Sequence, residues 1–225
     1  MKAVVRVEDV WKTYGMGSPR EVHALRGVSL TVEEGIVTAI AGPSGSGKTT
    51  LLSIMGLLTV PSKGRVYLKD QEMSGFSEIY RTRLRREEIG FVFQSQYLLP
   101  HLTAVENVAL PLLATDISIS EAEHIARDRL IMLGMEHRLD FKVAELSGGE
   151  QQRVSIARAM MNDPTILIAD EPSSSIDEEL TRELLSLLRA MVEETGLTVI
   201  VASHDPIVLD WADVRFNMRD GRIVG

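Results

Sequence analysis

A glycine-rich octapeptide in this sequence has the residue types and spacing needed to hold a chain of phosphates. Residues 42–49 read Gly-Pro-Ser-Gly-Ser-Gly-Lys-Thr and satisfy the pattern G-x-x-x-x-G-K-[ST]. Gly45 and Gly47 let consecutive N–H groups face one anion, Lys48 reaches the β- and γ-phosphates, and the Thr49 hydroxyl coordinates Mg²⁺. The predicted phosphate-binding residues are Gly42, Pro43, Ser44, Gly45, Ser46, Gly47, Lys48, Thr49 and Thr50.

Two adjacent acids, Asp170 and Glu171, follow the apolar run at residues 166–169. Acids are poor strand residues, and ligands of parallel sheets bind at the carboxyl ends of the strands. Asp170 fits a magnesium partner, direct or through water, and Glu171 fits the group that orients or deprotonates the attacking water. Such a pair is weak evidence by itself, but together with the loop at 42–49 it predicts hydrolysis of the bound phosphate chain.

The elements that must position these residues alternate between strand and helix. Residues 36–41 are a short apolar run typical of a buried strand, and an apolar helix continues through residues 51–58. The helix begins near Gly47, so its positive end adds to the phosphate site. Further strands are expected at residues 3–10, 22–32, 65–69 and 89–93, the first two in an antiparallel sheet.

From Thr103 to about Met161 the pattern is helical. Ser120-Glu-Ala-Glu123 predicts a capping box that opens a helix to Leu133, with Gly134 as its stop, and Ser147-Gly-Gly-Glu150 predicts a second capping box. Beyond this region strands are expected at residues 166–169, 197–202, 214–218 and 222–224, and helices at 178–194 and shortly after 202.

Alternation of this kind predicts an α/β fold, because parallel strands need crossover helices. We expect one domain over residues 1–225: a P-loop core with a parallel sheet, an N-terminal antiparallel β subdomain, and an inserted helical subdomain. The core is predicted at approximately 1–94 and 162–225, and the helical subdomain at approximately 95–161.

The composition excludes several classes of function. The sequence has no cysteine, which rules out disulfides, thiolate catalysis and Cys-ligated metal centres. Its net charge of -8 disfavours a nucleic-acid binder, and the arginines at residues 81–86 are interpreted as a solvated helix face. No apolar run reaches the ~20 residues that span a bilayer, and the N-terminus has no signal-peptide core. We expect a cytoplasmic chain that reaches a membrane only through a partner.

With these residues in place, the sequence resembles the ATPases of the ABC family. Residues 146–153, Leu-Ser-Gly-Gly-Glu-Gln-Gln-Arg, resemble the signature sequence and precede the acidic strand, as they do in that family. The resemblance implies ATP and Mg²⁺ as ligands. It also implies roles for Gln94 as the Q-loop glutamine that senses the γ-phosphate beside the metal, for His204 as the switch histidine, and for Tyr14 beneath the adenine.

The signature has a physical rationale, because Ser147 caps a helix whose free N–H groups make an anion site. One chain already holds its own phosphates at residues 42–49, so a second anion site is useful if it serves the ATP of another molecule. In the family, two such domains sandwich two ATPs head to tail. The resemblance therefore implies a homodimer in which Ser147, Gly148 and Gly149 complete the site of the partner.

The segment at residues 173–177 resembles the D-loop, which contributes Asp177. It reads Ser-Ser-Ser-Ile-Asp, where the family more often has Thr-Ser-Ala-Leu-Asp. The aspartate is retained, so the departure puts only the fine geometry in question. The expected catalytic groups are all present: Lys48, Gln94, Glu171 and His204.

Residues 94–112 resemble the short ATPases of lipoprotein-release, macrolide-export and cell-division permease systems. In those systems a groove receives a coupling helix from the membrane subunit, and residues 97–100 (Tyr-Leu-Leu-Pro) would lie near it. The resemblance implies a transporter motor that works with integral membrane permease subunits at the inner face of the cell membrane, with export as the direction and no nucleic-acid partner.

Rival interpretations come from other classes. ABC ATPases of DNA repair, chromosome organisation or translation usually carry coiled-coil arms, zinc modules or tandem cassettes, whereas the stretch from Gln94 to Ser147 is short and has no sustained heptads. A soluble scaffold ATPase for cofactor assembly has the same cassette, and the sequence does not discriminate against it. An ordinary P-loop kinase or GTPase has no use for the signature helix.

Overall fold

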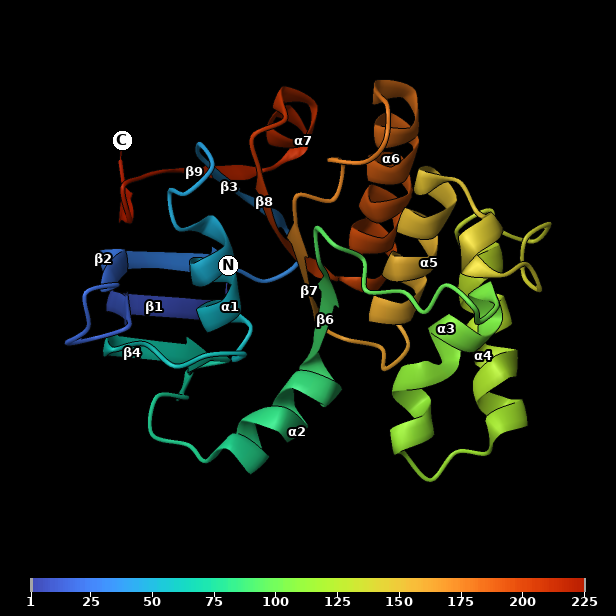
Figure 1. Ribbon diagram of the computed structural model, residues 1–225, viewed down its shortest axis with the longest axis horizontal. Helices are drawn as coiled ribbons and strands as arrows, with labels where there is room; N and C mark the ends of the chain where they lie inside the picture. The colour runs from blue at the N-terminus through green and yellow to red at the C-terminus, as the bar shows by residue number, and fades with distance from the viewer. Residues whose placement is uncertain (1, 225) are drawn as a thin grey trace.

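The computed structural model describes residues 2–224, which form two sheets with helices packed around them (Figure 1). The larger sheet has the strand order β10-β9-β3-β8-β7-β6 and is parallel except for the terminal β9–β10 hairpin. Its strands are β3 (Val37–Ala41), β6 (Ile89–Val92), β7 (Ile166–Asp170), β8 (Thr198–Ser203), β9 (Val214–Arg219) and β10 (Arg222–Ile223). The α/β class expected from the alternation of elements is confirmed.

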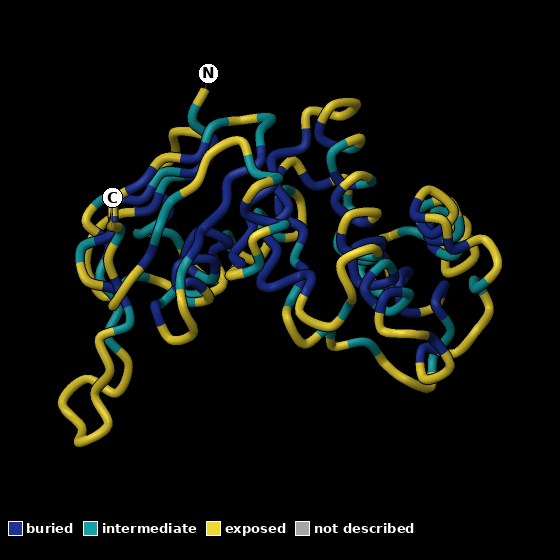
Figure 2. The backbone as a smooth tube through the Cα atoms, turned by 90° about the horizontal axis from the view of Figure 1, so that it is seen from above, coloured by how far each residue is buried: buried dark blue, intermediate teal, exposed yellow. Residues whose placement is uncertain are grey.

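The second sheet is antiparallel, with the order β2-β1-β4-β5. Its strands are β1 (Ala3–Tyr14), β2 (Val22–Glu33), β4 (Lys63–Leu68) and β5 (Gln71–Glu72). The loop between β1 and β2 is exposed and projects at the left edge of Figures 1 and 2. The expected N-terminal β subdomain is therefore present, with longer strands than the alternating pattern predicted.

The parallel strands have a core on each face because successive side chains point to opposite sides. Ile40, Ile166 and Ile168 face a core shared with the antiparallel sheet and with α1 (Lys48–Met55). Ala39 and Leu167 face the other core, which the helices after β6 cover. Figure 2 shows these central strands as the buried interior. The phosphate loop joins β3 to α1 and is therefore anchored at both ends by buried elements.

The helices beside the second core are α3 (Ala104–Ala109), η1 (Leu110–Ala114), α4 (Ile119–Met132), η2 (Val143–Glu145), α5 (Gly148–Ala159), α6 (Glu178–Thr195) and α7 (Pro206–Trp211). α3, α4 and α5 pack on one another at the right of Figure 1. The subdomain boundaries near residues 95 and 161 stay a prediction.

The capping predictions had different outcomes. The box at Ser147 and Glu150 is confirmed, with both reciprocal bonds formed. The box predicted at Ser120 is wrong, because Ser118 is the N-cap and accepts from the N–H of Glu121. Both serines precede an acid by three residues. The preceding Ile117 packs against the core, which places the cap at the earlier serine. Gly134 ends the helix as expected, with φ 71°.

The basic run lies on α2 (Glu78–Glu88), a helix without a buried residue. The expected helix face is confirmed, but it is not fully solvated. Arg81 and Arg85 both pair with Glu78, at 2.5 Å and 2.7 Å, and Arg85 also donates to the carbonyl of Leu57. Over residues 2–224, the structure contains no helix whose length and apolarity would let it cross a membrane.

Candidate active site

A cavity of about 420 Å³ opens where β3, β7 and β8 end. The phosphate loop and α1 form one wall, and the segments that follow the other strands complete it. The sequence-predicted residues that line the cavity are Pro43, Ser44, Gly45, Gly47, Lys48, Thr49, Thr50, Gln94, Asp170, Glu171 and His204. The structure therefore brings the phosphate loop, the acidic pair, the glutamine and the histidine into one site.

The phosphate loop needs glycine at Gly47 for two reasons. Its φ of 104° lies in the region that disfavours a side chain, and a Cβ there would lie 2.5 Å from the carbonyl oxygen of Ala24. Gly47 is also the N-cap of α1, and no side chain among the described residues caps this helix. The first N–H groups of α1 are therefore free to bind an anion, as the sequence predicted.

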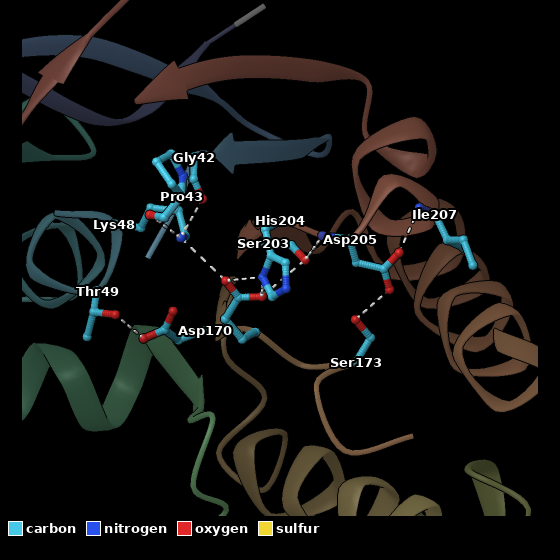
Figure 3. Close-up of polar contacts among 11 residues, drawn as sticks. Gly42, Pro43, Lys48, Thr49, Asp170, Ser173, Ser203, His204, Asp205 and Ile207 are labelled. Carbon is cyan, nitrogen blue, oxygen red and sulfur yellow. Dashed lines mark hydrogen bonds and ion pairs between the residues drawn. The ribbon is translucent and has the colours of Figure 1, made fainter. Parts of the chain in front are cut away.

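Lys48 holds a buried positive charge over the loop, as Figure 3 shows. Its Nζ donates to the carbonyl oxygens of Gly42 and Pro43, at 2.8 Å and 3.2 Å, and lies 3.4 Å from a carboxylate oxygen of Glu171. The ammonium is therefore aimed at the space that the loop encloses.

Thr49 and Asp170 meet on the other side of the loop. The Thr49 hydroxyl donates to Oδ2 of Asp170 at 2.6 Å (Figure 3). The other oxygen, Oδ1, is buried and accepts no hydrogen bond within residues 2–224. Burial raises the pKa of Asp170 above its ordinary value, against the opposing effect of the Thr49 hydrogen bond. A cation beside Oδ1 would favour the ionised form, so this pair fits a metal.

Glu171 is held by contacts of both its backbone and its side chain. Its backbone is left-handed, with φ 49°, and its N–H donates to the carbonyl of Ala202. Backbone strain of this kind concentrates at functional sites. Nδ1 of His204 lies 3.0 Å from both carboxylate oxygens, and the Ser203 hydroxyl lies 3.4 Å from one of them. The carboxylate is thus fixed between Lys48 and His204 at the wall of the cavity.

Several predicted site residues lie elsewhere. Tyr14, at the end of β1, is 44% exposed and does not line the cavity, although its strand partner Val22 does. Gly42 and Ser46 belong to the loop but not to the cavity wall. Ser147, Gly148 and Gly149 begin α5, where the Ser147 hydroxyl accepts from the N–H of Glu150. Asp177 caps α6 by accepting from the N–H of Leu180 at 3.0 Å.

The structure adds residues that sequence reasoning missed. The cavity wall also includes Val22, His23, Ala24, Asp220 and Gly221. In the β9–β10 turn, the N–H of Gly221 donates to the carbonyl of Ser46 at 2.9 Å, and its carbonyl accepts from the N–H of Arg26 at 2.8 Å. The Asp-Gly pair between two short strands is a hairpin signal. That signal could have found the turn, but not its contact with the phosphate loop.

Replacing Gly221 with alanine is expected to raise the KM for ATP severalfold. Its φ is 75°, which costs a non-glycine residue about 1–2 kcal/mol, and a Cβ would lie 2.8 Å from the carbonyl oxygen of Ala24. Relief of that contact moves the turn away from Ser46 and shifts the phosphate loop. Steady-state ATP hydrolysis measures the effect.

Gly196→Ala is the matched control, because Gly196 has φ 73° with open space around it and lies at the end of α6. It carries the same backbone strain without a contact to the loop. An equal rise of KM in both variants would show that general destabilisation, and not the turn, sets the affinity for ATP.

A phosphate loop, a strand ending in two acids, a histidine after the next strand and a capped signature helix define an ATPase of the cassette type. Residues 25–174 match the family described as ABC transporter. The chain belongs to that family, as an ATP-binding subunit that hydrolyses ATP to drive a membrane transporter.

Individual relatives agree with this assignment. The chain is 44% identical to an ABC transporter ATP-binding protein of Thermotoga maritima, over 100% of this chain and 95% of the relative. It is 43% identical to the lipoprotein-releasing system ATP-binding protein LolD of Ruegeria sp., over 99% and 98%. The dimeric post-hydrolysis structure of the ATP-binding cassette MJ0796, bound to ADP and Pi, has a TM-score of 0.90 and 40% identity over 98% of this chain and 97% of that one.

Proposed function

We propose that this chain powers the export or extraction of a substrate through integral membrane permease subunits, from the cytoplasmic face of the membrane. A groove of about 540 Å³ between β6 and α5 carries this proposal. Its walls are mainly apolar and aromatic: Ile89, Gly90, Phe91, Phe93, Tyr97, Pro111, Arg158, Ala159 and Asn162. An open groove of this composition fits a helix or loop of a partner protein.

The aromatic side of the groove is ordered by its own packing. Phe91 and Phe93 stack with centroids 5.6 Å apart, and Tyr97 meets Phe93 edge-on at the same distance. Tyr97 is 72% exposed, which presents an aromatic anchor to a partner. Of the neighbouring residues expected at the groove, Leu98 instead packs against the core. The name of the Ruegeria relative supports a permease of the lipoprotein-releasing type as the partner.

Hydrolysis is proposed to use the groups fixed around the cavity. Lys48 binds the β- and γ-phosphates, and Glu171 accepts a proton from the attacking water while His204 holds the carboxylate and stabilises the developing charge. Gln94, at the cavity wall, senses the γ-phosphate. Tyr14 is proposed to contact the adenine beside Val22, His23 and Ala24, the wall nearest its strand.

Mg²⁺ is proposed at the pair Thr49 and Asp170, with Gln94 as a further oxygen ligand. The fit rests on the orphaned Oδ1 of Asp170 and on the hydroxyl beside it. No group of three or more His, Cys, Asp or Glu side chains in the described part of the chain is arranged to hold a metal. That suits Mg²⁺, which is usually bound by one or two protein groups and substrate phosphates. The bound ion would neutralise charge on the phosphate oxygens.

Two copies of this chain are proposed to close around two ATPs. The capping box at Ser147 satisfies the N–H of Glu150, which leaves the N–H groups of Gly148 and Gly149 to face an anion. These groups do not line the cavity of their own chain. The dimeric structures of MJ0796 support a dimer as such. We take the head-to-tail arrangement from the family resemblance; in it, this signature serves the γ-phosphate of the second copy and Asp177 lies at the interface.

A nucleic-acid partner is not proposed, because the densest run of arginines is neutralised within its own helix. Arg81 and Arg85 pair with Glu78, and Arg83 lies 3.6 Å from Glu87. Phosphate contacts need basic side chains that are free to exchange counterions. The same observation disfavours the DNA-repair and chromosome types of ABC ATPase.

Affinity purification from detergent-solubilised native membranes tests the permease proposal. The tagged Glu171→Gln chain is used with ATP and Mg²⁺, because it should remain in the ATP-bound dimer, and the captured proteins are identified by mass spectrometry. A multi-span membrane protein, lost when Tyr97 is also changed to serine, is the expected result. Recovery of soluble proteins alone would contradict the proposal and favour a cofactor-assembly scaffold.

A further inference from the structure

The segment of residues 94–97 connects the two sites described above. Gln94 lines the nucleotide cavity, and Tyr97 lines the apolar groove. Tyr97 has a left-handed backbone, with φ 50°, so the segment turns sharply where it meets the groove. Ser95 and Gln96 therefore join a residue of the cavity wall to a residue of the groove wall.

Gln96 ties this segment to α5. Its Nε2 donates to Oε1 of Gln152 at 2.9 Å, and Gln152 is 2% exposed. Further along the same helix, the guanidinium of Arg158 donates to the backbone carbonyls of Gln96 and Tyr97. The segment is thus attached to α5 at two levels, one through a buried amide and one through a cation.

Ser175, in the D-loop segment, lies beside Gln96 and the start of α5. Its hydroxyl oxygen lies 3.5 Å from Nε2 of Gln96. Its carbonyl oxygen lies 3.0 Å from the position that a Cβ on Gly148 would occupy, so it touches the start of the signature helix. Three segments that are distant in the sequence therefore meet at one polar junction.

The junction has a second hydrogen-bonded arrangement available. Nε2 of Gln152 is buried and has no partner within residues 2–224. If the side-chain amides of Gln96 and Gln152 both rotate by half a turn, Nε2 of Gln152 can donate to Oε1 of Gln96. The hydrogen bonds from Arg158 to the backbone carbonyls are kept.

We propose that Gln96 is a positioning residue that, with Gln152 and Ser175, transmits the position of Gln94 to α5. The junction thereby sets how Ser147, Gly148 and Gly149 are presented to the ATP of the second copy. This inference rests on the proposed composite site of the dimer. It concerns hydrolysis by the chain alone and is independent of the permease.

The test is steady-state ATP hydrolysis by the purified chain. Gln96→Leu keeps the approximate volume and removes the amide, so it should lower kcat about 3- to 30-fold while the KM for ATP changes less than about twofold. Ser175→Ala, at an exposed position, should lower kcat in the same way, and the double variant should be no slower than Gln96→Leu. Ser95→Ala is the control, since Ser95 is exposed and its side chain makes no hydrogen bond to the described residues.

Unchanged kcat in Gln96→Leu would overturn the proposal. The proposal would also be overturned if the two reductions in kcat multiplied in the double variant, because the two residues would then act separately. A parallel rise in KM or loss of thermal stability would show a merely structural role. Failure of the composite site itself is distinguishable, because Ser147→Arg would then retain full hydrolysis.

Discussion

Glu171→Gln is expected to lower the rate of ATP hydrolysis by about 10²–10⁴-fold while ATP binding is retained. The carboxylate faces the cavity between Lys48 and His204, where it can take a proton from water. An amide of the same shape fills the same space but cannot accept that proton. Bound ATP then persists, and the head-to-tail dimer should accumulate in size-exclusion chromatography with ATP and Mg²⁺.

Glu194→Gln is the matched control for this substitution. Glu194 lies on α6, outside the cavity, and is exposed. It loses the same charge without touching the site and should hydrolyse ATP at the wild-type rate. Wild-type turnover by Glu171→Gln, with no ATP-dependent dimer, would remove the role assigned to Glu171.

Lys48→Ala is expected to weaken ATP binding by about 10- to 100-fold, the size of a lost hydrogen bond to a charged group. Lys48 is 7% exposed and is the cation that the loop carbonyls and Glu171 hold over the phosphate position. Removing the ammonium group takes away a positive charge that attracts the phosphates. It also removes the ion pair between Lys48 and Glu171. Titration with a fluorescent ATP analogue measures the affinity.

Lys63→Ala provides the comparison, because Lys63 is exposed on β4 and lies outside the cavity. The same charge change there should leave the affinity within about twofold, since exposed charges are screened. Equal affinities of the wild-type chain and Lys48→Ala would place the phosphates somewhere other than residues 42–49.

The sequence predicted the parts of the site that depend on local chemistry. The phosphate loop needs its glycines and lysine within eight residues, and the acids close a strand that is apolar along its length. Both features occur where they were expected. The capping box at Ser147 is likewise local, and it is confirmed. Ser118 and Ser120 satisfy the same capping pattern, so only the packing of Ile117 could decide between them.

The remaining features depend on contacts between distant segments. Gly221, near the end of the chain, supports the phosphate loop through its hydrogen bond to Ser46. The sequence positions of the two residues do not predict that hydrogen bond. The bond between Gln96 and Gln152 joins a loop to a helix in the same way. Tyr14 was placed by resemblance, and the structure puts its strand partner Val22 at the cavity instead. Its contact with adenine stays a prediction.

Each ATP is expected to be hydrolysed between Glu171 of one copy and Ser147 of another. Mixing two inactive variants tests it directly. Ser147→Arg should bind ATP but should not form a dimer of two Ser147→Arg chains. Glu171→Gln keeps an intact signature but lacks the catalytic base. A mixed dimer contains one site with an intact Glu171 facing an intact Ser147.

ATP hydrolysis is measured for each variant separately and for the mixture, combined before ATP is added. The mixture is expected to hydrolyse ATP well above the sum of the two separate rates. A mixture that gives only that sum, with both variants folded and binding ATP, would contradict it and place both groups in the site of a single chain.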